Sequence, residues 1–140
     1  MSTHTASAGR VPSVKPGLPL VALRYLALLS TLNVICQGAS AGRLLMKSHE
    51  GLVLHEAGAV VIHVLTGLTM IAAAWVWRSS RGTPWPTVLA AVVFVATFIQ
   101  ALTGHGRTLY IHVPLALLLL LGSAWLLAWS WFGARRPVSS

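Results

Sequence analysis

The sequence predicts an all-α, polytopic membrane protein folded as an antiparallel four-helix transmembrane bundle. The first observation is composition: 56% of the 140 residues are hydrophobic and only 9% are charged, whereas charged residues make up about a quarter of an ordinary soluble domain. The second is that the apolar residues fall into long stretches, each near the roughly 20 residues that a helix needs to cross a bilayer. These stretches are residues 17–39, 51–77, 87–103 and 109–132.

The first stretch follows residues 1–16, which are rich in Ser, Thr, Ala and Pro. We expect this segment to be a disordered cytoplasmic tail. The sequence Ala39-Ser40-Ala41 near the end of the first stretch has the small-residue form of a signal-peptide cleavage site. The apolar region before it exceeds the roughly 7 to 15 residues of a usual signal peptide. We therefore expect a retained transmembrane helix.

The remaining stretches complete one domain. Pro84 and Pro86 flank Trp85 between the second and third stretches, and they predict the end of one helix and the start of the next. The third stretch has 17 residues, and Trp85 and Gly104 can extend it into the membrane interface. The sequence thus predicts a single transmembrane domain over residues 17–134, followed by a second cytoplasmic tail over residues 135–140.

The net charge of +8 comes from basic residues that lie between the apolar stretches rather than on one face. We interpret them as signals that orient the protein in the bilayer, and not as a nucleic-acid-binding surface. Arg10, Lys15, Arg78, Arg81, Arg135 and Arg136 are predicted on one side of the membrane, and Arg43, Lys47 and Arg107 on the other. Six against three predicts that both termini are cytoplasmic. Arg24 lies inside the first stretch, and we expect it to snorkel toward the cytoplasmic interface.

A weak internal repeat relates the two halves of the chain. The sequence CQGASAGR ends the first apolar stretch and IQALTGHGR ends the third, so Gln37 and Gln100 occupy corresponding positions. Each is followed by a stretch with a histidine near its start, in LVLH and in LYIH. Two helical hairpins related by a twofold axis along the membrane normal would make His55 and His112 counterparts.

These two histidines are the main candidates for a binding site, because polar groups inside a membrane are costly and usually functional. They begin spans that run in the same direction, so they lie at equal depth within about one turn of helix. Diagonal helices of a four-helix bundle are roughly 11 to 14 Å apart. That gap is too wide for a direct hydrogen bond between two imidazoles, and it suits a planar cofactor with one histidine on each side. The sequence therefore predicts His55 and His112 as axial ligands of one haem.

Other roles for the pair stay open. The two histidines could form structural hydrogen bonds between helices, bind another metal, or take part in a proton relay. Zinc fits less well, because it usually takes four ligands and only Glu56 or His105 could be added. The single cysteine, Cys36, excludes a disulfide framework and a CxxC motif.

Two neighbouring residues are secondary candidates for the cofactor site. Glu56 points about 100° away from His55 around the helix, so it could orient a ligand, balance a haem iron, or simply face the wet interface. His63 lies about 12 Å deeper than His55, where the fourth span has Leu120 and no histidine. We expect His63 to pack against Gly67 or to bond a neighbouring helix, with ligation as the alternative.

The motifs H…AGA, FIQALTG and HVPLALLL resemble one four-helix half of haem A synthase. The resemblance covers residues 20–132 at the level of architecture. It implies haem ligation by His55 and His112 and a nearby structural role for Gln100. The chain has Leu52 and Glu56 where the family's catalytic haem site has Glu and Arg, and no cysteine pair lies in the first outer loop. Small four-helix b-type cytochromes of bacterial membranes are at least as similar.

The expected function is therefore that of a membrane electron carrier with one haem b on the outer side of the bilayer. The alternatives are an accessory subunit of a respiratory or other membrane complex, without its own haem, and a reduced haem A synthase-like enzyme. The expected partners are the lipid bilayer and other membrane subunits or further copies of the chain. Eight Arg against two Lys and the abundant Ala suggest a bacterial source, and hence a bacterial plasma membrane.

Overall fold

A computed structural model of the chain describes residues 17–134, and these residues form the predicted four-helix bundle. Its helices are α1 (Leu18–Leu45), α2 (His49–Ser80), α3 (Trp85–Thr103) and α4 (Leu109–Ala128), with a 3-10 turn η1 (Gly106–Thr108) before α4 and a π-helical turn η2 (Trp129–Gly133) after it. All four spans are long and apolar enough to cross a membrane. The predicted tails, residues 1–16 and 135–140, lie outside the described residues.

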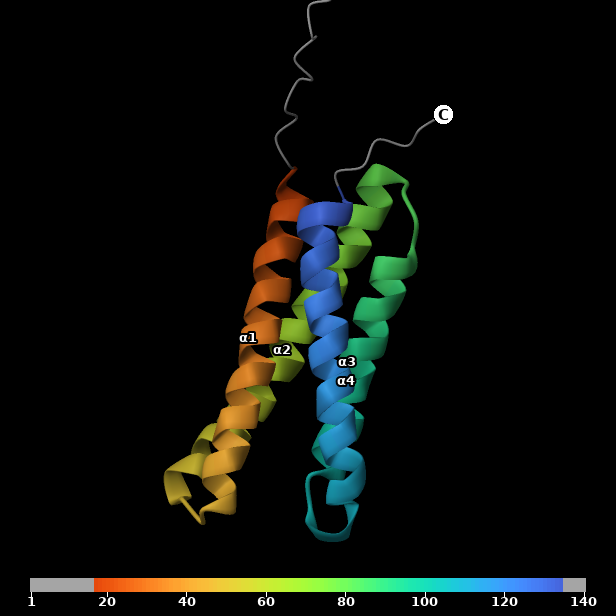
Figure 1. Cartoon of the computed structure of the whole chain (residues 1–140). Coiled ribbons are helices and arrows are strands. Elements are labelled where there is room, and N and C mark those ends of the chain that lie inside the picture. The colour runs from red at the N-terminus through yellow and green to blue at the C-terminus, as the bar shows by residue number, and fades with distance from the viewer. Residues whose placement is uncertain (1–16, 135–140) are drawn as a thin grey trace, which may run out of the picture.

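The helices run antiparallel, in the order of the chain (Figure 1). The start of α1, the α2–α3 loop and the end of η2 lie at one end of the bundle, and the α1–α2 and α3–α4 loops lie at the other. We call the corresponding halves the terminal half and the loop half. The α1–α2 hairpin and the α3–α4 hairpin diverge toward the loop half (Figure 1).

The first loop is shorter than the sequence predicts, because α1 continues past Ala39 to Leu45. No proline interrupts residues 40–45, so the helix ends only where Lys47 turns the chain in a left-handed conformation with φ 58°. Ser48 then caps α2 by accepting a hydrogen bond from the Gly51 N–H. Arg43 therefore lies on a helix, where it forms an ion pair with Glu50 of α2.

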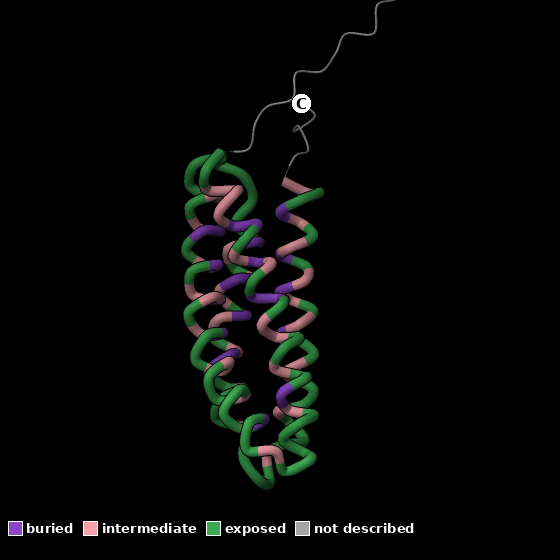
Figure 2. The backbone as a smooth tube through the Cα atoms, turned by 90° about the vertical axis from the view of Figure 1, so that its left-hand side faces the viewer, coloured by how far each residue is buried: buried purple, intermediate pink, exposed green. Residues whose placement is uncertain are grey.

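The apolar core is concentrated in the terminal half, as the distribution of buried residues shows (Figure 2). It is built from Leu23, Ala27, Ala72, Ala73, Ala90 and Leu126. Four of these six are alanines, and such small residues let helices approach closely in a membrane. Within residues 33–61 and 98–118, which make up the loop half, only Ser40 and Gly51 are buried. Packing thus joins the two hairpins mainly at one end.

Arg24 does not snorkel to the interface, and that prediction is wrong. Its side chain is 4% exposed, its Nε–H donates to the Ser130 carbonyl at 2.9 Å, and its guanidinium lies 4.8 Å from the centre of the Trp131 ring. The last carbonyls of a helix lack intrahelical partners and carry partial negative charge. The turn η2 therefore offers Arg24 a closer partner than the water of the interface.

The close approach of α1 and α2 at their loop gives a prediction for Gly51. A Cβ at this position would lie 2.8 Å from the Arg43 Cβ and 2.9 Å from the Leu44 nitrogen, so Gly51→Ala should force the two helices apart. We expect it to lower the free energy of unfolding by about 1 to 3 kcal/mol. Gly42→Ala is the matched control, because a Cβ there meets nothing within 4 Å. Thermal unfolding in lipid checks both variants, and equal melting temperatures would contradict this account of the turn.

Candidate functional site

The structure brings His55 of α2 and His112 of α4 together across the loop half. Their ring centroids are 6.3 Å apart and their planes are inclined by 53°. Both residues are half-buried, and no hydrogen bond joins the two rings. The matched depth predicted from the sequence thus corresponds to a direct juxtaposition of the side chains.

The protonation pattern of His112 follows from its hydrogen bond. Its Nδ1 lies 2.8 Å from the backbone carbonyl oxygen of Gln100, in the preceding helix. A carbonyl only accepts, so Nδ1 must carry the proton and donate. In the neutral ring the proton-free nitrogen is then Nε2, which has no hydrogen-bond partner among the described residues. Gln100 holds the ring through its backbone rather than through its side chain.

His55 is held in the same way by the preceding helix of its own hairpin. Its Nδ1 lies 3.1 Å from the Ser40 Oγ, and the Ser40 hydroxyl lies 3.0 Å from the Gln37 carbonyl. Because the hydroxyl donates to that carbonyl, its oxygen is left to accept from Nδ1–H. Gln37 of α1 also holds the backbone of α2 at this point, since its Nε2 donates to the His55 carbonyl at 3.0 Å. The Nε2 of His55 likewise has no partner in the described part of the chain.

This arrangement is the one that metal-ligating histidines need. Such residues present one nitrogen to the metal and donate the other N–H to a protein oxygen, which fixes the tautomer and the ring orientation. Two further polar atoms near this half of the bundle are buried without a hydrogen-bond partner, the Asn33 Oδ1 and the Gln100 Oε1. A buried acceptor without a donor is unfavourable, and both atoms lie in the half of the bundle that holds the histidine pair.

The other predicted site residues lie apart from the pair. The Nδ1 of His63 donates to the Ala59 carbonyl in its own helix. Its ring packs against Phe98 in a T-shaped arrangement, with the centroids 4.5 Å apart. A Cβ at Gly67 would lie 3.2 Å from the Phe94 ring, so Phe94 of α3 packs closely over this glycine. Glu56 is exposed on α2. Within residues 17–134, no group of three or more His, Cys, Asp or Glu side chains could hold a metal ion.

Ser40 is the site residue that reasoning from the sequence missed. In the sequence Ser40 stands only in the small-residue motif Ala39-Ser40-Ala41, whereas the structure buries its hydroxyl between Gln37 and His55. A signal was present, because Ser30, Asn33, Gln37 and Ser40 follow one another at intervals of 3, 4 and 3 residues. Such spacing places polar side chains on one face of a helix. That stripe predicts the interior face of α1.

Comparison with family models, with curated proteins and with solved structures found no match for this chain. The fold and the site therefore define its class on their own. It is a four-helix membrane-spanning bundle in which two diagonal helices present a facing pair of histidines, each fixed from its own hairpin.

The two hydrogen bonds give a prediction for the metal-free protein. Both His55 and His112 should carry their proton on Nδ1, as imidazole ¹⁵N chemical shifts can determine in lipid bilayers. Ser40→Ala removes the acceptor of His55 only, so His55 should shift toward the Nε2–H tautomer while His112 does not change. Ser30→Ala is the control, because Ser30 is also buried on α1 but bonds Thr69. An unchanged His55 tautomer in Ser40→Ala would contradict the assigned hydrogen bond.

Proposed function

We propose that this protein holds one b-type haem between His55 and His112 and serves electron transfer in a membrane. The observation that carries the proposal is the separation of the two rings. Imidazoles on opposite sides of one metal ion, each bonded at about 2 Å, have their centroids about 6 Å apart. The centroids here are 6.3 Å apart, with an unpartnered Nε2 on each ring.

The packing of the loop half supports an inserted group. A hydrogen bond from Arg24 of α1 to the Ser130 carbonyl joins the α1–α2 and α3–α4 hairpins in the terminal half. The bonds that hold His55 and His112 each stay within one hairpin. A group ligated by both histidines would therefore join two hairpins that otherwise diverge and bury little between them.

The roles of the protein side chains follow from this geometry. The Gln100 carbonyl and the Ser40 hydroxyl keep both rings oriented, so neither ligand needs to reorganise when the charge of the site changes. A bound haem would supply one-electron chemistry, with a potential set by its axial ligands and their surroundings. The chain has Leu52 and Glu56 where the catalytic haem site of haem A synthase has Glu and Arg. This favours an electron carrier over a reduced haem A synthase-like enzyme.

The proposed setting is a bacterial plasma membrane with both termini in the cytoplasm. The four apolar spans and the exposed apolar side chains along them are consistent with contact to lipid. The orientation rests on the six-to-three distribution of basic residues. On this topology the loop half, with the histidine pair, lies toward the outer side.

The first functional prediction concerns the two proposed ligands. His55→Ala and His112→Ala should each abolish the low-spin, six-coordinate absorption spectrum, because each removes one axial ligand. His63→Ala is the matched control, since this ring contacts Phe98 and not the pair. The measurement is haem per protein and the oxidised and reduced spectra of the purified variants.

Two results would reject the haem proposal. One is an unchanged low-spin spectrum in His112→Ala, which would remove that ligand from the site. The other is a native protein that takes up no haem when it is expressed with haem supplied. In that case the two histidines would be structural, as expected for an accessory subunit of a membrane complex.

The second functional prediction concerns orientation. In a Cys36→Ala background, Met46→Cys in the loop half should react with an impermeant thiol reagent added to intact cells. Ser80→Cys at the opposite end should react only after the cells are opened. Both positions are exposed, and the native Cys36 is also exposed and must be removed. The reverse pattern of labelling would place the histidine pair on the cytoplasmic side.

A further inference from the structure

Gly58 of α2 lies where the side chain of Gln37 reaches across from α1. A Cβ at position 58 would lie 2.6 Å from the Gln37 Oε1 and 2.9 Å from the Gln37 Cδ. These distances are shorter than any that a real Cβ adopts, so a larger residue at this position would displace the Gln37 side chain. Because glycine has no Cβ, the amide of Gln37 can lie directly against the backbone of α2.

From this position Gln37 holds the part of α2 that carries His55. Its Nε2 donates to the His55 carbonyl at 3.0 Å. Its Oε1 lies 3.3 Å from the Ser40 hydroxyl, which accepts a hydrogen bond from the His55 ring. The Gln37 amide thus contacts both the backbone of His55 and the partner of its ring. A methyl group at position 58 would push this amide away and break the bond to the His55 carbonyl.

Gly104 has the corresponding place in the second hairpin. It is the C-cap residue of α3, and a Cβ there would lie 3.2 Å from the His112 Cε1 and 3.4 Å from the His112 Nδ1. The same Nδ1 donates to the Gln100 carbonyl. A methyl group at position 104 would press on this edge of the ring, which would have to move by a few tenths of an ångström. Glycine leaves the ring free to keep its hydrogen bond.

We infer that Gly58 and Gly104 are positioning residues for the histidine pair, one in each hairpin. Gly58 acts on His55 through the Gln37 side chain, and Gly104 acts on the His112 ring directly. Their effect on the orientation of the rings does not require a bound group. Their effect on haem binding rests on the proposed function, so the two effects are tested separately.

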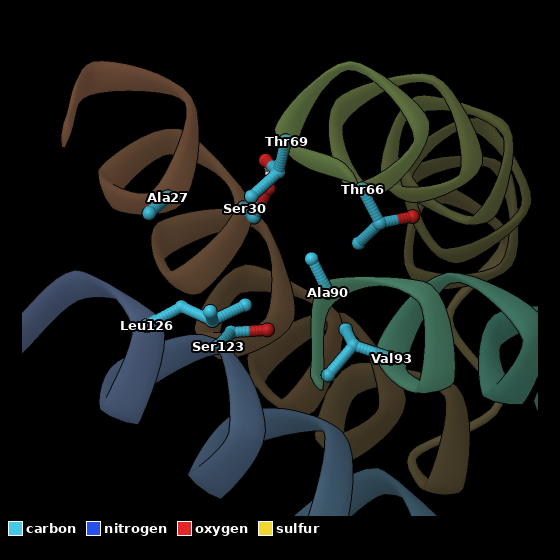
Figure 3. Close-up of a pocket in the computed structure, with 8 residues that line it drawn as sticks. All are labelled: Ala27, Ser30, Thr66, Thr69, Ala90, Val93, Ser123 and Leu126. Atoms are coloured by element: carbon cyan, nitrogen blue, oxygen red, sulfur yellow. Dashed lines mark hydrogen bonds between the residues drawn. The ribbon is translucent and has the colours of Figure 1, made fainter. Parts of the chain in front are cut away.

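The structure indicates that a change at Gly58 has a local effect. The atoms that a Cβ would displace belong to the end of a flexible side chain rather than to the backbone. The helices α1 and α2 also share a second hydrogen bond deeper in the bundle, where the hydroxyls of Ser30 and Thr69 lie 3.1 Å apart (Figure 3). We therefore expect α1 and α2 to stay paired in Gly58→Ala.

The first experiment measures the imidazole ¹⁵N chemical shifts of the metal-free protein in lipid bilayers. Gly58→Ala should shift the resonances of His55 and leave those of His112 unchanged, and Gly104→Ala should do the reverse. Each variant is thus the control for the other. Gly38→Ala should shift neither ring, because a Cβ there meets nothing within 4 Å. Unchanged rings in both variants, or equal shifts of both rings in each, would overturn the inference.

A double-mutant cycle tests whether Gly58 acts through Gln37. Gln37→Ala removes the side chain that a methyl group at position 58 would displace, so it should shift His55 in the same way as Gly58→Ala. Adding Gly58→Ala to Gln37→Ala should then change His55 no further, because residues that act through one contact are not additive. The double variant contains no overlap, so the test stays decisive if Gly58→Ala alone fails to fold. A further shift of His55 in the double variant would overturn this role of Gly58.

Haem affinity tests the part of the inference that rests on the proposed function. Changing the residues that orient a metal-ligating histidine typically lowers metal affinity by about 10- to 100-fold. We expect Gly58→Ala and Gly104→Ala each to lower haem affinity by about tenfold, and Gly38→Ala to leave it unchanged. Native haem affinity in both variants would overturn their role in haem binding. A native protein that takes up no haem would instead reject the proposed function, and the ¹⁵N shifts would still decide whether the two glycines position the rings.

Discussion

The close packing of small residues in the terminal half is the constraint on which the rest of the structure depends. Ala27, Ala72, Ala73 and Ala90 are almost fully buried, and they let the helices approach there without large side chains between them. Leu23 and Leu126 fill the remaining space in the same cluster. Because the hairpins are fixed at this end, they can diverge at the other. The terminal half thus provides stability, while the loop half is left open to other contacts.

The second constraint is that lipid supplies no hydrogen-bond partners, so interior polar groups must be satisfied within the protein. The hydroxyls of Thr66 and Thr69 meet this requirement by donating to carbonyls of their own helix. The Nε–H of Arg24 meets it by donating to the Ser130 carbonyl in η2. The two histidines satisfy this requirement with only one of their two ring nitrogens. Each Nδ1 is bonded while each Nε2 has no described partner. Histidines whose only role was to hold the two hairpins together would instead donate hydrogen bonds from one hairpin to the other.

The sequence predicts the helices and the histidine pair well, because both depend on periodicity and depth along the chain. The chain has four apolar stretches, bounded by Pro84, Pro86 and the basic loops, and these leave few alternatives to four spans. Counting residues from the start of each span places His55 and His112 at matching depth. The contacts of Arg24 and Ser40 could not be predicted in this way. These contacts depend on which side chain of another helix lies opposite. A membrane-spanning helix is apolar both on the face toward lipid and on the face toward protein, so its sequence does not show which face is which.

The arrangement of the pair bears on how the site would work. Each histidine is oriented by the helix that precedes it in its own hairpin, through Ser40 in one case and Gln100 in the other. The two rings are therefore pre-positioned independently, and their separation is set by the distance between hairpins rather than by either hairpin alone. The alanine packing and the bond from Arg24 to Ser130 join the hairpins in the terminal half. We expect a change at that end of the bundle to alter the spacing of the rings without touching either one, because closely packed interiors transmit strain.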